Sequence, residues 1–233
     1  MINTLENLLS QKKNFIFLGE TGSGKSEVAL NFAVKLAEGS DREKRSVQIF
    51  DMDQTKPLFR SRDLRETMER RGIAIRFSDQ MLDAPTLVSG VAECLADPKR
   101  FALLDIGGGE TAARMAGGFA RFINEENSAA VYVINPYRPW SKDTPSISDT
   151  MSYIMNATRV RHVYILGNPN LGPGTSAEEF LEGCEKLKEI LDENISIVGA
   201  CVREKLFEDV RAKVSDMVIF PMRLYLTYPW VDE

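Results

Sequence analysis

The residues best suited to chemistry lie in one glycine-rich stretch, GETGSGKS, which runs from Gly19 to Ser26. Its pattern, G-x-x-x-x-G-K-S, is the P-loop signature. Glycines let successive backbone N–H groups turn inward around an anion, and no Cβ then hinders the approach of a phosphate. In such a loop Lys25 would neutralise the β- and γ-phosphates, and the Ser26 hydroxyl would bind Mg²⁺. A flexible glycine linker with a solvated lysine is the alternative interpretation.

The segments on either side of this stretch favour the first interpretation. The apolar run NFIFL predicts a buried strand before it, and SEVALNFAVKLAEG predicts a helix after it. Val28, Phe32 and Leu36 fall on one face of that helix, and Gly39 suits its end. The positive end of a helix dipole favours a bound phosphate at this point. We therefore expect nucleotide contacts from Gly19, Glu20, Thr21, Gly22, Ser23, Gly24, Lys25 and Ser26.

A magnesium-bound triphosphate also needs carboxylates, and the first candidate is Asp105. It ends the apolar run FALLD, which is the usual Walker B arrangement for a residue that meets the metal. Three glycines, 107–109, follow and would let the backbone bend close to a γ-phosphate and move when that phosphate leaves. The alternative is a strand-ending aspartate that caps the next helix.

The second candidate is the pair Asp51 and Asp53 at the end of SVQIFDMD. Side chains alternate along a strand, so both carboxylates would point the same way if the extended form persists. One would hold a metal-bound water and the other would position the attacking water, whereas capping of a following helix is the alternative. Lys56, Arg60 and Arg62 come next, and one of them could stabilise transition-state charge. For any single one, a solvated surface charge is the simpler interpretation.

Short apolar runs alternate with helical patterns along most of the chain, which predicts βαβ units. Several runs are apolar at nearly every position, as expected of strands buried on both faces. We expect a three-layer α/β fold with a mostly parallel sheet and helices on both faces, in a single domain over 1–233. The expected strands are NFIFLG, SVQIFD, IAIRF, FALLDIG, AAVYVIN, RHVYILG, ISIVGACV and MVIF.

Composition excludes several other classes. The net charge of −5 argues against a nucleic-acid surface, and no apolar stretch reaches the roughly 20 residues that a membrane span needs. The start of the chain lacks the pattern of a secretory signal, so we expect a cytoplasmic protein. Cys94, Cys184, Cys201 and the single His162 are too dispersed for a zinc or cluster site, and buried thiols are expected.

With these motifs in place, the chain resembles the MinD/ParA-type P-loop ATPases of the SIMIBI class. The resemblance covers most of the chain and rests on the glycine-rich stretch, IFDMDQTKP, LLDIGGG and VYILGNPNLGP. It implies that Asp51 lies near Mg²⁺, that Asp53 orients the attacking water, and that Asn168 reads the nucleotide base. A turn former before proline is the alternative for Asn168.

One departure from the resemblance concerns Glu20. Most relatives carry a signature lysine at this position, which reaches the nucleotide of a partner subunit, and this chain lacks it. Another cation, such as Arg60, Arg62 or Arg138, would have to replace it; otherwise hydrolysis is slow or the dimer differs. Glu20 is otherwise a solvent-facing loop residue.

The expected function is therefore a Mg-dependent ATPase that acts as a nucleotide-driven switch on a protein partner, with ATP/ADP and Mg²⁺ as cofactors. ATP is favoured over GTP because no aspartate follows Asn168 at the spacing used for guanine. Lys25, Asp53 and Asp105 are the expected catalytic residues, and Ser26, Asp51 and Asp105 the expected metal ligands. A homodimer follows from the resemblance alone. The alternatives are a P-loop kinase and a binder that does not hydrolyse.

Two further segments carry aromatic residues. The proline-rich stretch 135–148, NPYRPWSKDTPSIS, predicts a surface loop whose Tyr137, Arg138 and Trp140 suit a partner surface or packing over the sheet edge. The final segment, FPMRLYLTYPWVDE, is aromatic and ends in acids, so we expect it to pack on the body or on a partner.

Overall fold

The chain folds around one parallel β-sheet in the computed structural model, which describes residues 4–39, 45–53, 62–77, 89–191, 195 and 197–226. Eight strands pair in the order β3-β2-β4-β1-β5-β6-β7-β8, and every pairing is parallel. The strands are β1 (Asn14–Leu18), β2 (Ser46–Asp51), β3 (Ile73–Phe77), β4 (Arg100–Asp105), β5 (Ser128–Ile134), β6 (Tyr164–Gly167), β7 (Ile197–Arg203) and β8 (Ile219–Met222).

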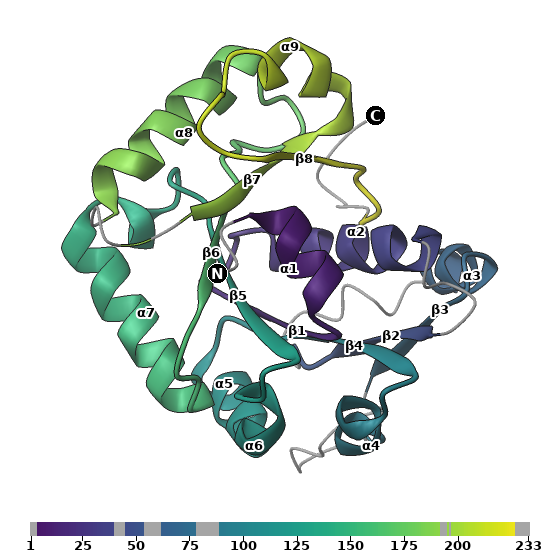
Figure 1. Ribbon diagram of the computed structural model, residues 1–233. Helices are drawn as coiled ribbons and strands as arrows, with labels where there is room; N and C mark the ends of the chain where they lie inside the picture. Colours follow the sequence, from purple (N-terminus) through teal and green to yellow (C-terminus); the bar gives the residue numbers. More distant parts are fainter. Residues whose placement is uncertain are drawn as a thin grey trace.

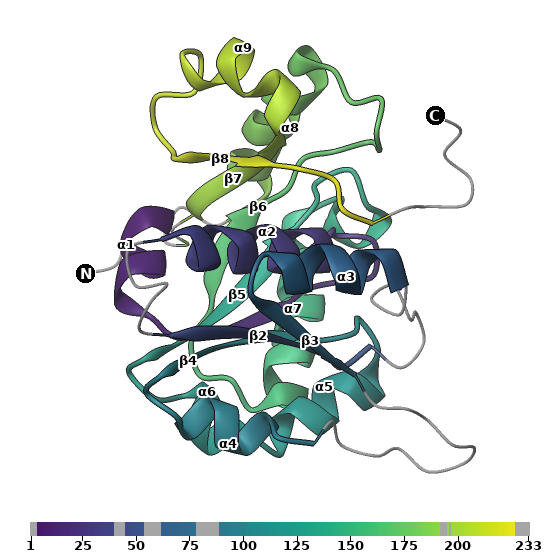
Figure 2. The ribbon, with the colours of Figure 1, turned by 90° about the vertical axis from the view of Figure 1, so that its right-hand side faces the viewer.

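Helices cover both faces of this sheet, as Figures 1 and 2 show. One face packs against α1 (Leu5–Gln11), α2 (Lys25–Glu38) and α3 (Arg62–Arg70). The other face packs against α4 (Val91–Ala96), α5 (Glu110–Gly117), α6 (Ala120–Ile123), α7 (Thr144–Thr158) and α8 (Ala177–Ile190). Helix α9 (Phe207–Arg211) lies beside β8. The expected three-layer α/β fold is thus confirmed.

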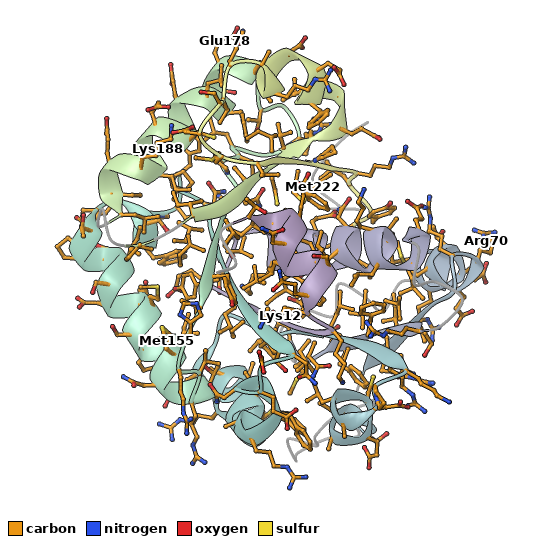
Figure 3. The ribbon with its side chains drawn as sticks, in the orientation of Figure 1. Lys12, Arg70, Met155, Glu178, Lys188 and Met222 are labelled. Carbon is orange, nitrogen blue, oxygen red and sulfur yellow. The ribbon has the colours of Figure 1, made fainter. Side chains whose placement is uncertain are left out.

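Strand β1 lies in the middle of the sheet, between β4 and β5. All five of its residues are buried, as the continuous run NFIFL predicts. The aromatic ring of Phe32 on α2 contacts Phe15, Phe17 and Phe220 edge to face, with ring centroids 5.8, 5.1 and 5.4 Å away. Figure 3 shows side chains filling the space between α2 and the sheet, with Met222 of β8 beside this layer. Packing therefore fixes the angle at which α2 leaves the sheet.

Two segments differ from the sequence-based expectation. The sequence predicts the last strand over MVIF, residues 217–220, but β8 runs from Ile219 through Pro221 to Met222, so it begins and ends two residues later. Proline is tolerated there because β8 is an edge strand, where one side of the backbone needs no partner. Within 135–148, a short 3₁₀ helix forms at Pro139–Ser141, and α7 already begins at Thr144 behind its N-cap Asp143.

The parallel sheet brings the loops that follow its strands to one edge. The carboxyl ends of β1, β2, β4, β5 and β6 all open onto this edge, where ligands bind in open α/β sheets. The described helices are each too short or too polar to cross a bilayer. All three cysteines are buried and free, which agrees with the expected buried thiols, and burial raises the pKa of Cys94 to about 11.

Candidate functional site

The glycine-rich stretch forms a closed turn between β1 and α2, and we call its residues Gly19–Gly24 the phosphate loop. Its conformation needs glycine at two points in particular. Gly24 has φ = 90°, and a Cβ there would overlap with Nδ2 of Asn168. A Cβ on Gly19 would overlap with the carbonyl oxygen of Val133 on the neighbouring strand β5. The sequence pattern is thus explained by close backbone contacts.

Every carbonyl from Glu20 to Gly24 accepts a hydrogen bond from a group outside the turn. The donors, in the order of these carbonyls, are Nζ of Lys25 (2.8 Å), Nε1 of Trp140 (3.0 Å), Nε of Arg138 (3.0 Å), Nδ2 of Asn168 (2.7 Å) and the backbone N–H of Val28 (3.1 Å). Within the turn, the Ser23 N–H donates to the Glu20 carbonyl at 3.2 Å. The turn leads into the N-terminus of α2, and loop N–H groups at a helix N-terminus are an anion-binding arrangement.

Lys25 and Ser26 begin α2 directly behind this turn. Lys25 as a residue is only 7% exposed, and its ammonium donates to the Glu20 carbonyl of the loop. The Ser26 hydroxyl donates to Oδ2 of Asp105 at 2.6 Å. The structure therefore brings together a cation, a hydroxyl and a strand-end carboxylate, as the sequence predicts.

Asp105 lies at the end of β4, and its side chain is buried. Burial raises the pKa of this carboxyl to about 6, while the nearby Lys25 ammonium and the Ser26 hydroxyl oppose the shift. Its second oxygen, Oδ1, is buried with no hydrogen-bond partner among the described residues. A buried carboxylate oxygen without a partner is costly, and a bound cation would remove that cost. The residues present thus fit a Mg²⁺ ion.

Asp51 ends β2 and is the register partner of Asp105 on the adjacent strand β4. The two carboxylates therefore leave the same edge of the sheet side by side. Asp53 is not part of the strand: its backbone N–H donates to Oδ1 of Asp51 at 2.9 Å, which turns the chain. A Cβ on Gly107 would lie 2.8 Å from Cγ of Asp53, so Asp53 packs against the glycines that follow Asp105.

Asn168 follows β6 and is 4% exposed. Its amide donates to the Ser23 carbonyl, so the side chain ties the end of β6 to the phosphate loop. The loop after β6 is tied in turn to the loop after β5, because Nδ2 of Asn135 donates to the Asn170 carbonyl at 2.8 Å. Reading of a base by Asn168 stays a prediction.

Glu27 and Asn31, which lie one turn apart on α2, have a structural role that no sequence pattern indicates. The Glu27 carboxylate accepts the backbone N–H groups of Tyr225 and Leu226, at 2.7 to 3.1 Å. Asn31 forms a reciprocal pair with the backbone of Arg223, at 2.9 Å in both directions. Burial raises the pKa of Glu27 to about 7, and its two backbone donors oppose the shift. The end of the chain, as far as Leu226, is thus fastened to the helix that follows the phosphate loop.

Some predicted residues lie outside the described part of the chain. Lys56 and Arg60 are outside the described residues, and so is the side chain of Arg62. Arg138, the remaining cation considered for the position of Glu20, lies against the phosphate loop.

Solved structures of other proteins share the fold of this chain. No protein-family model and no curated protein sequence matches the chain. The cell division protein FtsY of Thermotoga maritima is similar in structure, with a TM-score of 0.51 and 16% identity, over 84% of this chain and 68% of that chain. FtsY of Mycoplasma mycoides has a TM-score of 0.49 and 17% identity, over 84% of this chain and 61% of that chain. FlhF complexed with GTP and Mg²⁺ has a TM-score of 0.42 and 13% identity, over 79% of this chain and 70% of that chain.

The shared property is the fold. The chain shares with FtsY of Thermotoga maritima the three-layer α/β fold of P-loop NTPases. Its identity to these structures is low, and their binding partners and reactions belong to them. The resemblance to MinD/ParA-type ATPases is narrower than this finding and stays a prediction.

The contact between Gly24 and Asn168 gives a test of the loop geometry. We expect Gly24→Ala to lower the free energy of unfolding by about 1–3 kcal/mol, because alanine is strained at positive φ and its Cβ would overlap with the amide. In the double variant Gly24→Ala/Asn168→Ala the overlap is gone. The loss of unfolding free energy in the double variant should therefore be smaller than the sum of the losses in the two single variants. Denaturant unfolding measures both.

Gly174→Ala is the matched control, since a Cβ there meets nothing within 4 Å. It should leave stability within about 0.5 kcal/mol of the parent. Strictly additive costs for Gly24 and Asn168 would show that the two residues do not meet as described.

Proposed function

We propose that this protein binds a Mg-nucleoside triphosphate, hydrolyses it in the same site, and uses the cycle as a switch on a protein partner. The observation that carries the proposal is the joint arrangement of the phosphate loop, Lys25, Ser26 and Asp105. A glycine-rich turn at a helix N-terminus, the Lys25 ammonium beside it and a buried carboxylate oxygen without a described partner are all accounted for by one ligand, a Mg-bound phosphate chain.

In this proposal each side chain has a defined task. The loop N–H groups and Lys25 would bind the phosphates, while Ser26, Asp105 and Asp51 would hold Mg²⁺. The metal supplies positive charge that offsets the charge developing on the phosphate oxygens. Asp53 orients a water and accepts its proton as the water oxygen bonds to the γ-phosphorus. The bond from that phosphorus to the bridging oxygen breaks, and the diphosphate leaves with inorganic phosphate.

The glycines after Asp105 would convert the nucleotide state into a change of shape. A Cβ on Gly108 would lie 2.6 Å from Oγ1 and 2.7 Å from the backbone nitrogen of Thr21, so this segment rests directly on the phosphate loop. A γ-phosphate at the loop would therefore meet residues 107–109, and its loss would release them. The MinD/ParA-type resemblance makes a second copy of this chain one candidate for the partner.

Adenine is the base that we propose. Asn168, Pro169 and Asn170 follow β6, and this sequence places no carboxylate for the N–H groups of guanine. In competition against a fluorescent ATP analogue, we expect ATP to displace the probe at a lower concentration than GTP. Tighter binding of GTP would overturn the assignment of the base and leave the phosphate site intact.

Lys25 tests the phosphate site itself. We expect Lys25→Ala to weaken binding of Mg-ATP by about a hundredfold, because a buried charge-assisted contact to the phosphates is lost. Titration calorimetry measures the change. Lys35→Ala, an exposed lysine on the same helix, is the control and should bind like the parent protein. Unchanged affinity in the Lys25 variant would refute the site.

Asp53 tests the reaction. We expect Asp53→Ala to bind Mg-ATP like the parent and to release phosphate about 10²–10⁴-fold more slowly, since a base that accepts the proton of water is removed. Asp149→Ala, exposed on α7, is the control. Label from γ-³²P-ATP should appear in free phosphate; label on an acceptor molecule would indicate a kinase instead. Full turnover in the Asp53 variant would move the base role to another residue.

A further inference from the structure

The segment after β5 reaches the phosphate loop with two side chains. Nε of Arg138 donates to the Gly22 carbonyl at 3.0 Å, and Nε1 of Trp140 donates to the Thr21 carbonyl at 3.0 Å. The guanidinium also lies over Gly22, because a Cβ there would be 3.4 Å from Nε and 3.8 Å from Cζ of Arg138. These two contacts hold the half of the loop that begins after Glu20.

The segment that carries these side chains is itself braced. The backbone N–H of Arg138 donates to the Asn135 carbonyl, and the N–H of Ser141 donates to the Arg138 carbonyl, at 3.1 and 2.9 Å. Asn135 is fully buried, and its Oδ1 accepts the N–H of Tyr137. Pro136 and Pro139 further restrict the backbone. Arg138 and Trp140 thus approach the loop from a preorganised support, which lowers the entropic cost of their contacts.

The charge around the loop calls for a cation at this place. Asp51, Asp53, Asp105 and the half-buried Glu20 bring four carboxyl groups to the site that would also receive phosphates. Lys25 opposes this charge from the side of the helix. The guanidinium of Arg138 adds positive charge from the opposite flank of the loop, at Gly22.

The position of Thr21 indicates which part of the nucleotide this charge affects. Thr21 accepts from Trp140 on one side and meets Gly108 on the other. Gly108 belongs to the segment that follows the candidate metal ligand Asp105. With a phosphate chain bound at the loop as proposed, the Thr21–Gly22 half would lie beside the 107–109 segment, which would respond to the terminal phosphate.

We propose that Arg138 and Trp140 form a positioning arm that holds the Thr21–Gly22 half of the phosphate loop for the terminal phosphate, so that the protein prefers a nucleoside triphosphate to a diphosphate. This inference rests on the proposed function. Arg138 acts through its charge and through the Gly22 carbonyl, and Trp140 acts through the Thr21 carbonyl. The arm belongs to the same chain, so the preference needs no second subunit.

The test compares the dissociation constants of Mg-ATP and Mg-ADP for a set of variants of the full chain by calorimetry. We expect Arg138→Ala to weaken ATP binding about tenfold and ADP binding less than about threefold, which lowers the preference for the triphosphate. Arg138→Lys keeps the charge and should retain most of that preference, whereas Arg138→Gln keeps a donor without charge and should behave like alanine. Trp140→Phe should weaken ATP binding about threefold.

The control is Arg211→Ala, which replaces an exposed arginine on α9, outside the loops that contact the phosphate loop. This variant should bind both nucleotides like the parent. Equal losses of affinity for ATP and ADP in Arg138→Ala, or no loss of affinity in the Arg138 variants, would overturn the proposal of a positioning arm. If the parent protein binds neither nucleotide, it is the proposed function that fails.

A second measurement does not depend on altering the arm. In a Trp230→Phe variant, Trp140 is the remaining tryptophan, and its emission should change more on addition of Mg-ATP than of Mg-ADP. Identical emission with and without either nucleotide, in a protein that calorimetry shows to bind them, would also overturn the proposal.

Discussion

Six residues have to return the chain from the end of β1 to the start of α2, and the hydrogen bonds of their carbonyls decide what that turn can do. Each carbonyl from Glu20 to Gly24 is taken by a donor from elsewhere: a lysine at the helix start, a helix N–H, and three side chains from the loops after β5 and β6. These donors hold the peptides of the turn in place, at the surface for Thr21 and Gly22 and in the interior for Ser23. The Ser23 N–H donates within the turn, and the turn leads into the N-terminus of α2, a position that favours an anion.

The phosphate loop also explains why carboxylates and a hydroxyl lie beside it. A turn that presents N–H groups and an ammonium would attract any anion, so a selective site needs a metal position beside it. The parallel register of β2 and β4 brings Asp51 and Asp105 to the same edge, and Ser26 on α2 donates to Asp105, which is where we propose the metal position. Burial raises the pKa of Asp105 to about 6, because the Lys25 ammonium and the Ser26 hydroxyl offset only part of the cost of burying the charged carboxylate. Sheet order, helix start and metal position are therefore parts of one arrangement.

Those parts that depend on local pattern could be predicted from the sequence. The P-loop pattern, the strand before it, the helix after it and the strand-end Asp105 are each encoded within about ten neighbouring residues, and all were found where the pattern places them. Asp53 was expected to continue a strand, but the Asp51 carboxylate captures its N–H and ends the extended form. Periodicity carries no sign of such a side-chain bond.

The long-range contacts could not be predicted in this way. Arg138 and Trp140 lie 116 and 119 residues from the carbonyls that they bind, and the stretch 135–148 offered only a partner surface or packing over the sheet edge. Glu27 and Asn31 look like polar residues on the exposed side of α2, yet the segment from Arg223 to Leu226 covers them. Only the folded sheet shows which loops share an edge, and the donors for the turn come from those loops.

The most direct test of this account is an NMR titration of the backbone amides with a Mg-bound, non-hydrolysable ATP analogue. If the turn closes around a phosphate, the amide protons of Gly22, Gly24, Lys25 and Ser26 move downfield together and saturate at one common dissociation constant, while amides of α9 stay unchanged. If the analogue binds without moving these amides, or if they move independently of one another, the phosphate lies elsewhere and the account is wrong.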